Sequence, residues 1–144
     1  MGIEYKVDIA GLGPFAAAFA KATNEALGKM NTVRKEFITE MSDRIVDSTP
    51  VDTGRAKFNN QIAVNTIPQS ALFGTDKDGT ETKQRNKAEI EKSGMEDTVH
   101  LYNQVTYVDG LEHGTSKQAP NGFYGVNIGD AESILDAIVA KHKA

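Results

Sequence analysis

The chain has 144 residues, of which 39% are hydrophobic and 25% charged, the size and composition of about one globular domain. It contains no cysteine, which excludes disulfides and thiolate metal sites, and its formal net charge of -4 argues against broad nucleic-acid binding. No apolar run approaches the roughly 20 residues of a membrane span, and charges interrupt the opening "MGIEYKVDIAG", so we predict neither a membrane helix nor a signal peptide.

The first residues have the pattern of a strand followed by a turn. Ile3, Tyr5, Val7 and Ile9 alternate with polar residues, which is typical of a strand with one buried face. "GLGP" at residues 11–14 then turns the chain, and proline suits the first position of a helix because its missing N–H would be unpaired there.

Residues 14–47 are predicted to form one long helix. Apolar residues recur at steps of three and four, which keeps them on one side of a helix. These residues are Phe15, Phe19, Ala22, Ala26, Met30, Val33, Phe37, Met41 and Ile45. The helix should stop before Pro50 and be roughly 50 Å long. A compact domain of this size does not need such a length, so we expect part of the stripe to meet another subunit.

The middle of the chain changes character. In "AKFNNQIAVNTI", residues 56–67, apolar and β-branched residues fall on alternate positions and predict a second strand. Residues 75–97 are mostly charged or polar and cannot bury much surface. We expect a mobile charged excursion there, with one or two helical turns near residues 83–92.

The last third is predicted to contain two more strands and a helix. "TVHLYNQVTY" at residues 98–107 and "FYGVNI" at residues 123–128 both have a strand pattern. Residues 107–114 fit either a short helix ending at Gly114 or a plain connection between strands. Residues 130–143 predict an amphipathic helix with Asp130 as its N-cap.

These elements predict an α+β fold. We expect a small antiparallel sheet of about four strands, packed against one long N-terminal helix and a C-terminal helix. There is no internal repeat and no linker that would divide the chain, so residues 1–144 are predicted to form a single domain.

Three patterns have some likeness to cofactor or metal sites, and none is convincing. Gly11, Gly13 and Ala16 match the G-x-G-x-x-A of dinucleotide-binding folds, but the following helix is too long and Pro14 removes an amide. "DKDGTETKQRNKAE", from Asp76, places its glycine and its twelfth residue wrongly for a calcium loop. Without cysteine, a zinc site would need converging histidines and carboxylates. We predict no cofactor and no metal.

His113 and Ser116 are the one pair that could suggest hydrolysis. A catalytic triad needs a serine activated by a base that a third group orients. These two residues lie three apart in an expected turn, with no nucleophile-elbow glycines around the serine. We therefore do not predict an enzyme.

Two turn motifs remain without an assigned task. They are "TPVDTGR" at residues 49–55 and "YVDGLEHGTSKQAP" at residues 107–120. Proline, aspartate and glycine explain a turn at each place. They do not explain Arg55, Glu112 and Lys117, and charged groups on rigid turns are natural contact points between subunits.

The two motifs together resemble the tail-completion or neck family of long-tailed bacteriophages. Its members carry T-P-V-D-T-G-R-L after the first helix and, much later, N-N-x-P-Y-A-x-x-L-E-Y-G-x-S-K-Q-A-P-x-G-M-V. The positions of the second motif that match are Tyr107, Leu111, Glu112, Gly114, Ser116, Lys117, Gln118, Ala119, Pro120 and Gly122. This chain departs from the pattern at Ala56, Thr106, His113 and Phe123. None of these departures removes a charge or a turn residue.

The resemblance implies a virion structural protein at the head–tail junction, made in the host cytoplasm and without enzymatic activity. Such proteins form rings, commonly of six subunits, between the capsid connector and the tail tube. The implied partners are other copies of the chain, neck or connector proteins, and tail-tube or tail-terminator proteins. Viral DNA would pass through the lumen without sequence-specific binding. The candidate interface residues are Asp52, Arg55, Tyr107, Glu112 and Lys117.

Other readings of the sequence stay open at this point. Within the same neck, the chain could be a tail terminator or a head-closure protein. In a different class, it could be a small enzyme that uses the "GLG" loop or the pair His113 and Ser116.

Overall fold

The computed structural model describes the backbone of residues 13–143 and, within it, the side chains of residue 21 and residues 24–143. The strand expected at residues 3–9 and the glycine at position 11 lie outside the described residues. The elements, in chain order, are α1 (Gly13–Ser48), α2 (Arg55–Phe58), β1 (Gln61–Val64), α3 (Thr80–Lys92), β2 (Val99–Tyr102), α4 (Val108–Glu112), α5 (Tyr124–Gly129) and α6 (Ala131–Lys141).

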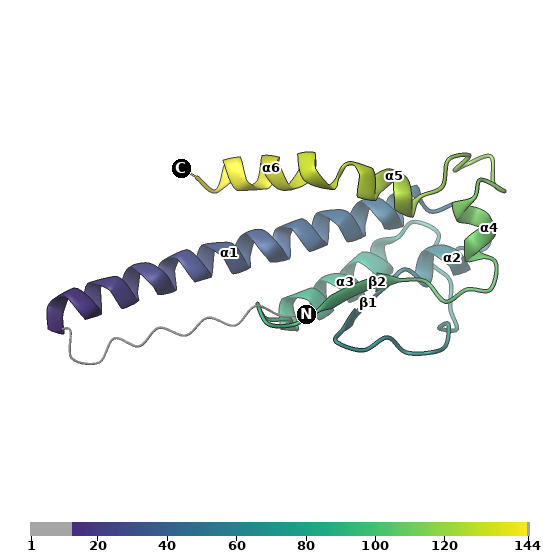
Figure 1. The fold of residues 1–144 in the computed structure, drawn as a ribbon. Coiled ribbons are helices and arrows are strands. Elements are labelled where there is room, and N and C mark those ends of the chain that lie inside the picture. The colour runs from purple at the N-terminus through teal and green to yellow at the C-terminus, as the bar shows by residue number, and fades with distance from the viewer. Residues whose placement is uncertain (1–12, 144) are drawn as a thin grey trace.

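The long helix α1 is the axis of the molecule and confirms the prediction for residues 14–47. It has 36 residues and is therefore about 54 Å long. Its last turn is closed by Thr49, whose hydroxyl donates to the carbonyl of Ile45 at 2.6 Å, and Pro50 follows. Toward its N-terminus α1 projects beyond the other helices (Figure 1).

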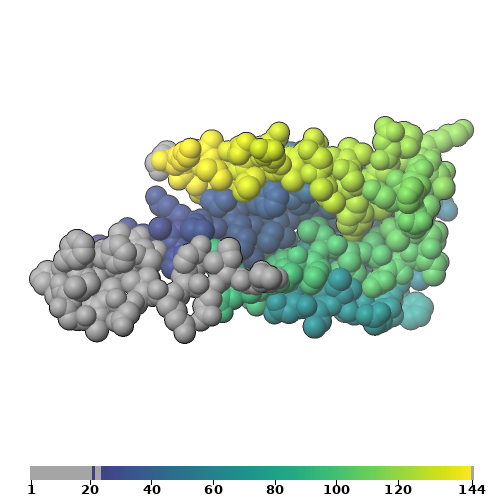
Figure 2. All heavy atoms as spheres, in the orientation of Figure 1, coloured from purple at the N-terminus to yellow at the C-terminus, as the bar shows by residue number. Residues whose placement is uncertain are grey.

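The C-terminal half of α1 lies between two layers. Helices α5 and α6 lie along one side, and α3 with the sheet lies along the other (Figure 1). In the space-filling view, the blue surface of α1 separates the yellow C-terminal helix from the green and teal segments (Figure 2). Met41 of α1 packs with Ile134 and Ile138 of α6, so the predicted amphipathic C-terminal helix uses its stripe as expected.

The fold is α+β, as predicted, but its sheet is smaller than expected. Among the described residues it has two antiparallel strands, β1 and β2, with Gln61 opposite Tyr102 and Val64 opposite Val99. The strand predicted for residues 123–128 is wrong, because these residues form α5. Val126 and Ile128 are exposed on that helix, so their alternation in the sequence does not mark a buried sheet face.

The predicted second strand is also shorter than expected. Residues 55–58 form the single-turn helix α2, which follows Gly54 in a left-handed conformation with φ of 90°. The strand begins only at Gln61. The alternation that includes Phe58 therefore crosses a boundary between two elements.

The expectation of a mobile excursion at residues 75–97, with one or two helical turns, needs correction. The segment contains α3, a helix of 13 residues that packs against α1 and β1. Ile90 is fully buried, and the polar side chains of Thr82 and Asn86 are buried with it. The sequence looked too polar to pack because this interface is built largely from hydrogen-bonded polar groups.

Asn60 connects most of these elements. Its side-chain NH₂ donates to the Thr49 hydroxyl at 2.7 Å, and its side-chain oxygen accepts from Asn103 at 3.1 Å and from the Tyr124 hydroxyl at 3.2 Å. Its backbone carbonyl accepts from Arg85 and from Asn86, both at 2.9 Å. The residue is only 3% exposed, so these partners replace water completely.

We predict that Asn60→Ala strongly destabilises the fold. The change removes a hydrogen-bond partner from buried Thr49 and from half-buried Asn103 and Tyr124, and a buried polar group left without its partner costs about 1–3 kcal/mol. The free energy of unfolding, measured by urea denaturation, should fall by about 3 kcal/mol or more. The control Asn121→Ala, at an exposed position, should change it by less than about 0.5 kcal/mol. A small effect at Asn60 would contradict this role.

Candidate functional site: a groove between the two turn motifs

The first turn motif, residues 49–55, is fixed against the start of α3. The Gly54 carbonyl accepts from the backbone N–H of Phe58 and of Asp76, both at 3.0 Å. A Cβ atom at Gly54 would lie 2.8 Å from the backbone of Asp76, so only glycine fits this approach. The motif is a rigid connector rather than a free loop.

Asp76 in turn holds the start of α3. Its carboxylate accepts from the N–H groups of Gly79 at 3.0 Å and Thr82 at 2.8 Å, and from the Thr82 hydroxyl at 2.7 Å. Burial raises the pKa of Asp76, but these hydrogen bonds together lower the pKa by more than burial raises it. The net pKa is therefore below the ordinary value of an aspartate. The aspartate that opens the calcium-like pattern in the sequence is thus a helix cap.

The second turn motif, residues 107–120, begins with the short helix α4 and continues as a loop folded back on it. Of the two alternatives for residues 107–114, the short helix is the one that forms, and Gly114 follows it with φ of 87°. A Cβ at Gly114 would lie 2.3 Å from the Pro120 carbonyl oxygen, and one at Gly122 would lie 2.4 Å from the Glu112 carbonyl oxygen. Both glycines are required by close backbone contacts.

Glu112 fastens this loop to α5. One carboxylate oxygen accepts from the N–H groups of Phe123 and Tyr124, and the other accepts from that of Gly125, all at 2.8 Å. These are unpaired donors at the start of a helix, where a negative charge is also favourable. Burial raises the pKa of Glu112, but the three hydrogen bonds lower it more, so the net pKa is below 4.5.

Gln118 joins the two turn motifs directly. Its side-chain oxygen accepts from the Val51 N–H, and its side-chain NH₂ donates to the Val51 carbonyl, both at 2.9 Å. This pair of bonds copies the pairing of two residues in an antiparallel sheet. Sequence reasoning did not single out Gln118, and the available signal was its place in the second motif.

The joined motifs enclose an open groove of about 580 Å³. Its walls are residues 50–55 of the first motif with the adjacent Ala56 and, from the second motif, Tyr107, Leu111, Thr115, Ser116 and Gln118. Of the five predicted interface residues, Asp52, Arg55 and Tyr107 line this groove. The fold brings Tyr107 to the same groove as Asp52 and Arg55, which are more than fifty positions away from it in the sequence.

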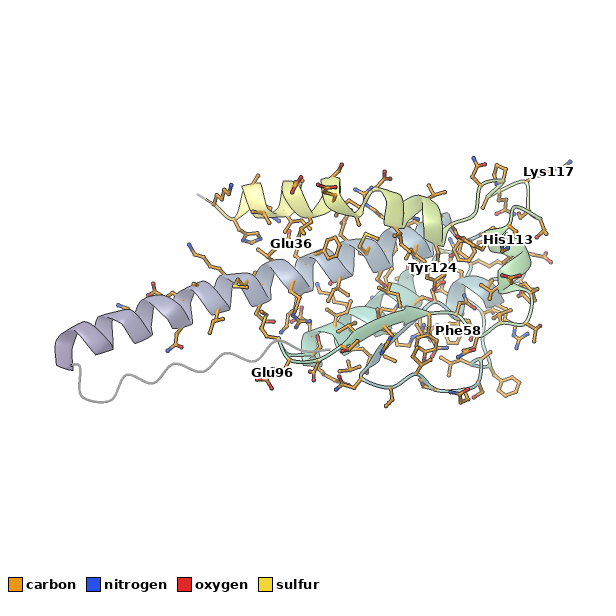
Figure 3. The ribbon with its side chains drawn as sticks, in the orientation of Figure 1. Glu36, Phe58, Glu96, His113, Lys117 and Tyr124 are labelled. Carbon is orange, nitrogen blue, oxygen red and sulfur yellow. The ribbon has the colours of Figure 1, made fainter. Side chains whose placement is uncertain are left out.

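The other two predicted interface residues lie elsewhere. Glu112 is half-buried and its carboxylate is used inside the chain, as described above. Lys117 is exposed near the outer end of the loop, away from the helices, and Figure 3 shows it pointing outward. It is therefore the one of the two whose charge is displayed to solvent.

His113 and Ser116 are not arranged as a base and a nucleophile. The imidazole Nδ1 of His113 is 2.7 Å from the Asp109 carbonyl oxygen, while the Ser116 hydroxyl accepts from the Gln118 N–H at 3.2 Å. The contact with the Asp109 carbonyl, and then the Asp109 carboxylate, raise the pKa of His113. Between these two described side chains the structure has no hydrogen bond.

Neither a metal cluster nor a membrane helix is found in the part of the chain that the structure describes. There, no three histidine, aspartate or glutamate residues gather as a cation would require. No helix among these residues combines the length and hydrophobicity needed to cross a bilayer.

We predict that Glu112→Gln lowers stability in a pH-dependent way. Because the pKa of Glu112 is lowered in the folded chain, its contribution is present above pH 4.5 and is lost as the pH falls through the folded value. At pH 7 the variant should lose about 2 kcal/mol of unfolding free energy, and the difference from wild type should shrink in more acidic solution.

Urea denaturation at several pH values measures this difference, with Glu132→Gln on the exposed face of α6 as the control. A deficit for Glu112→Gln that stays constant from pH 7 to well below pH 4.5 would contradict the capping role.

Comparison of the chain with protein-family models, with curated proteins and with solved structures gave no match. The resemblance to the phage neck family therefore stays a prediction that rests on the two turn motifs.

Proposed function

We propose that the protein is a bacteriophage virion component at the head–tail junction, where it forms a ring that completes the tail or neck and joins it to the capsid connector. One observation carries this proposal. The two motifs on which the family resemblance rests form the walls of a single groove, and Gln118 and Val51 hold them together.

The groove has properties that suit a protein partner. Its walls are turns whose geometry is fixed by glycine contacts and capped helices, so little order has to be created on binding. Arg55 and Tyr107 line it, and Tyr107 is 45% exposed. Arginine and tyrosine are among the residue types that most often dominate binding energy at interfaces.

The exposed charges near the groove support the same proposal. Asp52 lines the groove and Lys117 lies beyond its rim, and both are exposed. Rim charges contribute more to the rate and specificity of docking than to its final strength. A ring that must form between two particular neighbours needs such discrimination.

The projecting part of α1 gives independent support for a partner. The predicted apolar stripe is buried at Met41 and Ile45, but Ala26 and Met30 are exposed farther toward the N-terminus. The part of the chain that the structure describes does not cover this portion of the stripe. A second subunit would cover it, as the length of the helix suggested.

Deletion of the gene from a phage that encodes this chain tests the proposal. We expect DNA-filled heads and separate tails in electron micrographs, with infectivity restored when the wild-type chain is supplied from a plasmid. Fully infective particles without the protein would contradict the proposed function.

Arg55→Glu should fail to restore joining although it folds. The Arg55 side chain forms no hydrogen bond with the residues that the structure describes, so its reversal should change the unfolding free energy by less than about 0.5 kcal/mol. Lys87→Glu, an equal charge change at an exposed position of α3, is the matched control and should restore infectivity. If both variants restored infectivity equally, the proposal that Arg55 lies at the interface would be contradicted.

A further inference from the structure

Phe73 is displayed to solvent in an unusual way. Its side chain is 97% exposed, whereas Phe123 is fully buried. A phenylalanine buries about 150–250 Å² when it is covered, so its exposure leaves a large hydrophobic contribution unused. Scattered apolar residues are normal on surfaces, but a fully exposed aromatic ring is a candidate binding anchor.

The backbone on both sides of Phe73 is held in place. Asn59, itself fully buried, accepts from the Leu72 N–H at 2.7 Å and donates to the Leu72 carbonyl at 3.2 Å. Gly74 has φ of 145° and lies so close to the Phe58 ring that a Cβ would be 2.6 Å from it. The ring of Phe73 is therefore presented from anchored neighbours rather than from a loose loop.

A second feature of the same chain could receive such a ring. An open groove of about 470 Å³ lies between α1 and α6 and is lined mainly by apolar atoms. Its apolar lining residues are Met30, Val33, Phe37, Met95, Leu135 and Val139. Met30 and Leu135 remain 45% and 38% exposed, so the α1/α6 groove is not filled by the described part of the chain.

Phe73 and the α1/α6 groove lie toward opposite ends of the molecule. Leu72 and Gly74, which flank Phe73, contact Asn59 and Phe58 at the end of α2, and α2 follows the C-terminal end of α1. The groove instead lies along residues 29–37 of α1, beside the C-terminal end of α6 (Figure 1). A ring on one chain therefore does not reach the groove of the same chain. Contact between two different patches of identical chains repeats from copy to copy and closes into a ring when the rotation allows it.

Charge favours this pairing as well. The basic residues Lys29, Arg34 and Lys143 line the α1/α6 groove, and no acid is among its described lining residues. Among the eight residues after Phe73, the exposed acids Asp78 and Glu81 outnumber the exposed Lys77. In a chain of net charge -4, copies repel one another unless such opposite patches meet.

We propose that Phe73 of one copy inserts into the α1/α6 groove of a neighbouring copy, in a head-to-tail contact. This inference deepens the proposed function, because it names the surfaces through which the ring would form. One phenyl ring is far smaller than the roughly 1,200–2,000 Å² that a stable interface buries. It acts as an anchor, and the projecting part of α1 beside the groove supplies further contact area.

Cysteine cross-linking tests the contact directly, because the chain has no native thiol. Thr75→Cys, at an exposed position two residues from the ring, and Val139→Cys are made in separate chains that both keep Phe73, and the chains are mixed at high concentration and oxidised. We expect a disulfide-linked dimer in the mixture and little from either variant alone. Thr75→Cys mixed with Glu132→Cys, an exposed position of α6 outside the groove, is the matched control.

Two results would overturn the contact. One is a yield for the Val139 mixture no higher than for the Glu132 control. The other is a dimer formed mainly by Thr75→Cys alone, which would indicate a two-fold interface in place of a head-to-tail one. Either result leaves the deletion phenotype unaffected, so the contact can fail while the proposed function stands. Conversely, specific cross-linking together with infective deletion particles would retain the contact and reject the function.

Substitution of the ring provides a second test. Phe73→Ala should weaken self-association by about tenfold or more in sedimentation analysis, as expected for an aromatic anchor. Ile67→Ala, which removes another exposed apolar side chain from the same loop, should change it by less than about twofold. Equal effects of the two substitutions would contradict the anchor.

Discussion

The buried side chain of Asn60 is the interaction on which the other parts of the structure depend. The side chain forms hydrogen bonds with Thr49, Asn103 and Tyr124. The backbone carbonyl of Asn60 accepts a hydrogen bond from Arg85, so four segments meet at this residue. A single buried amide with all its partners fixes the relative positions of these segments more specifically than apolar packing would. The first turn motif therefore begins at a residue that Asn60 holds, Thr49, and the second is followed by another, Tyr124.

The groove follows from that arrangement through a short chain of contacts. Thr49 begins the first motif, and Tyr124 begins the helix that Glu112 caps. Gln118 then closes the remaining gap by bonding both backbone groups of Val51. The exposed residues of the two motifs are thus carried on one rigid support, which is the property that an assembly surface needs.

The sequence predicted the parts of the fold that depend on local pattern. The extent of α1, its end before Pro50 and the helix α6 were predicted correctly. Helical periodicity and turn residues determine structure through neighbours that are close in the sequence. Residues 123–128 were wrongly predicted as a strand, because the alternation of apolar residues in so short a segment does not distinguish a strand from a helix. The contact that favours the helix comes from Glu112, which lies outside the segment. Residues 80–92 were misread as largely unstructured, because their buried contacts are polar.

The site was predictable in part for the same reason. The two motifs could be found from their glycines, prolines and charges, and three of the predicted interface residues, Asp52, Arg55 and Tyr107, line the groove. Their role in an interface stays a prediction. No local pattern could show that Gln118 bridges the motifs, because that role exists only when both are in place. The partners of the groove remain a proposal.

Hydrogen exchange of backbone amides tests most directly the claim that the two motifs form one rigid unit. The N–H of Val51 in the first motif and that of Gly125 beyond the second are both hydrogen-bonded to side chains. We predict that both exchange slowly in the wild type and that Asn60→Ala accelerates both together. Acceleration of only one amide, or rates in the wild type typical of unprotected loops, would contradict the account.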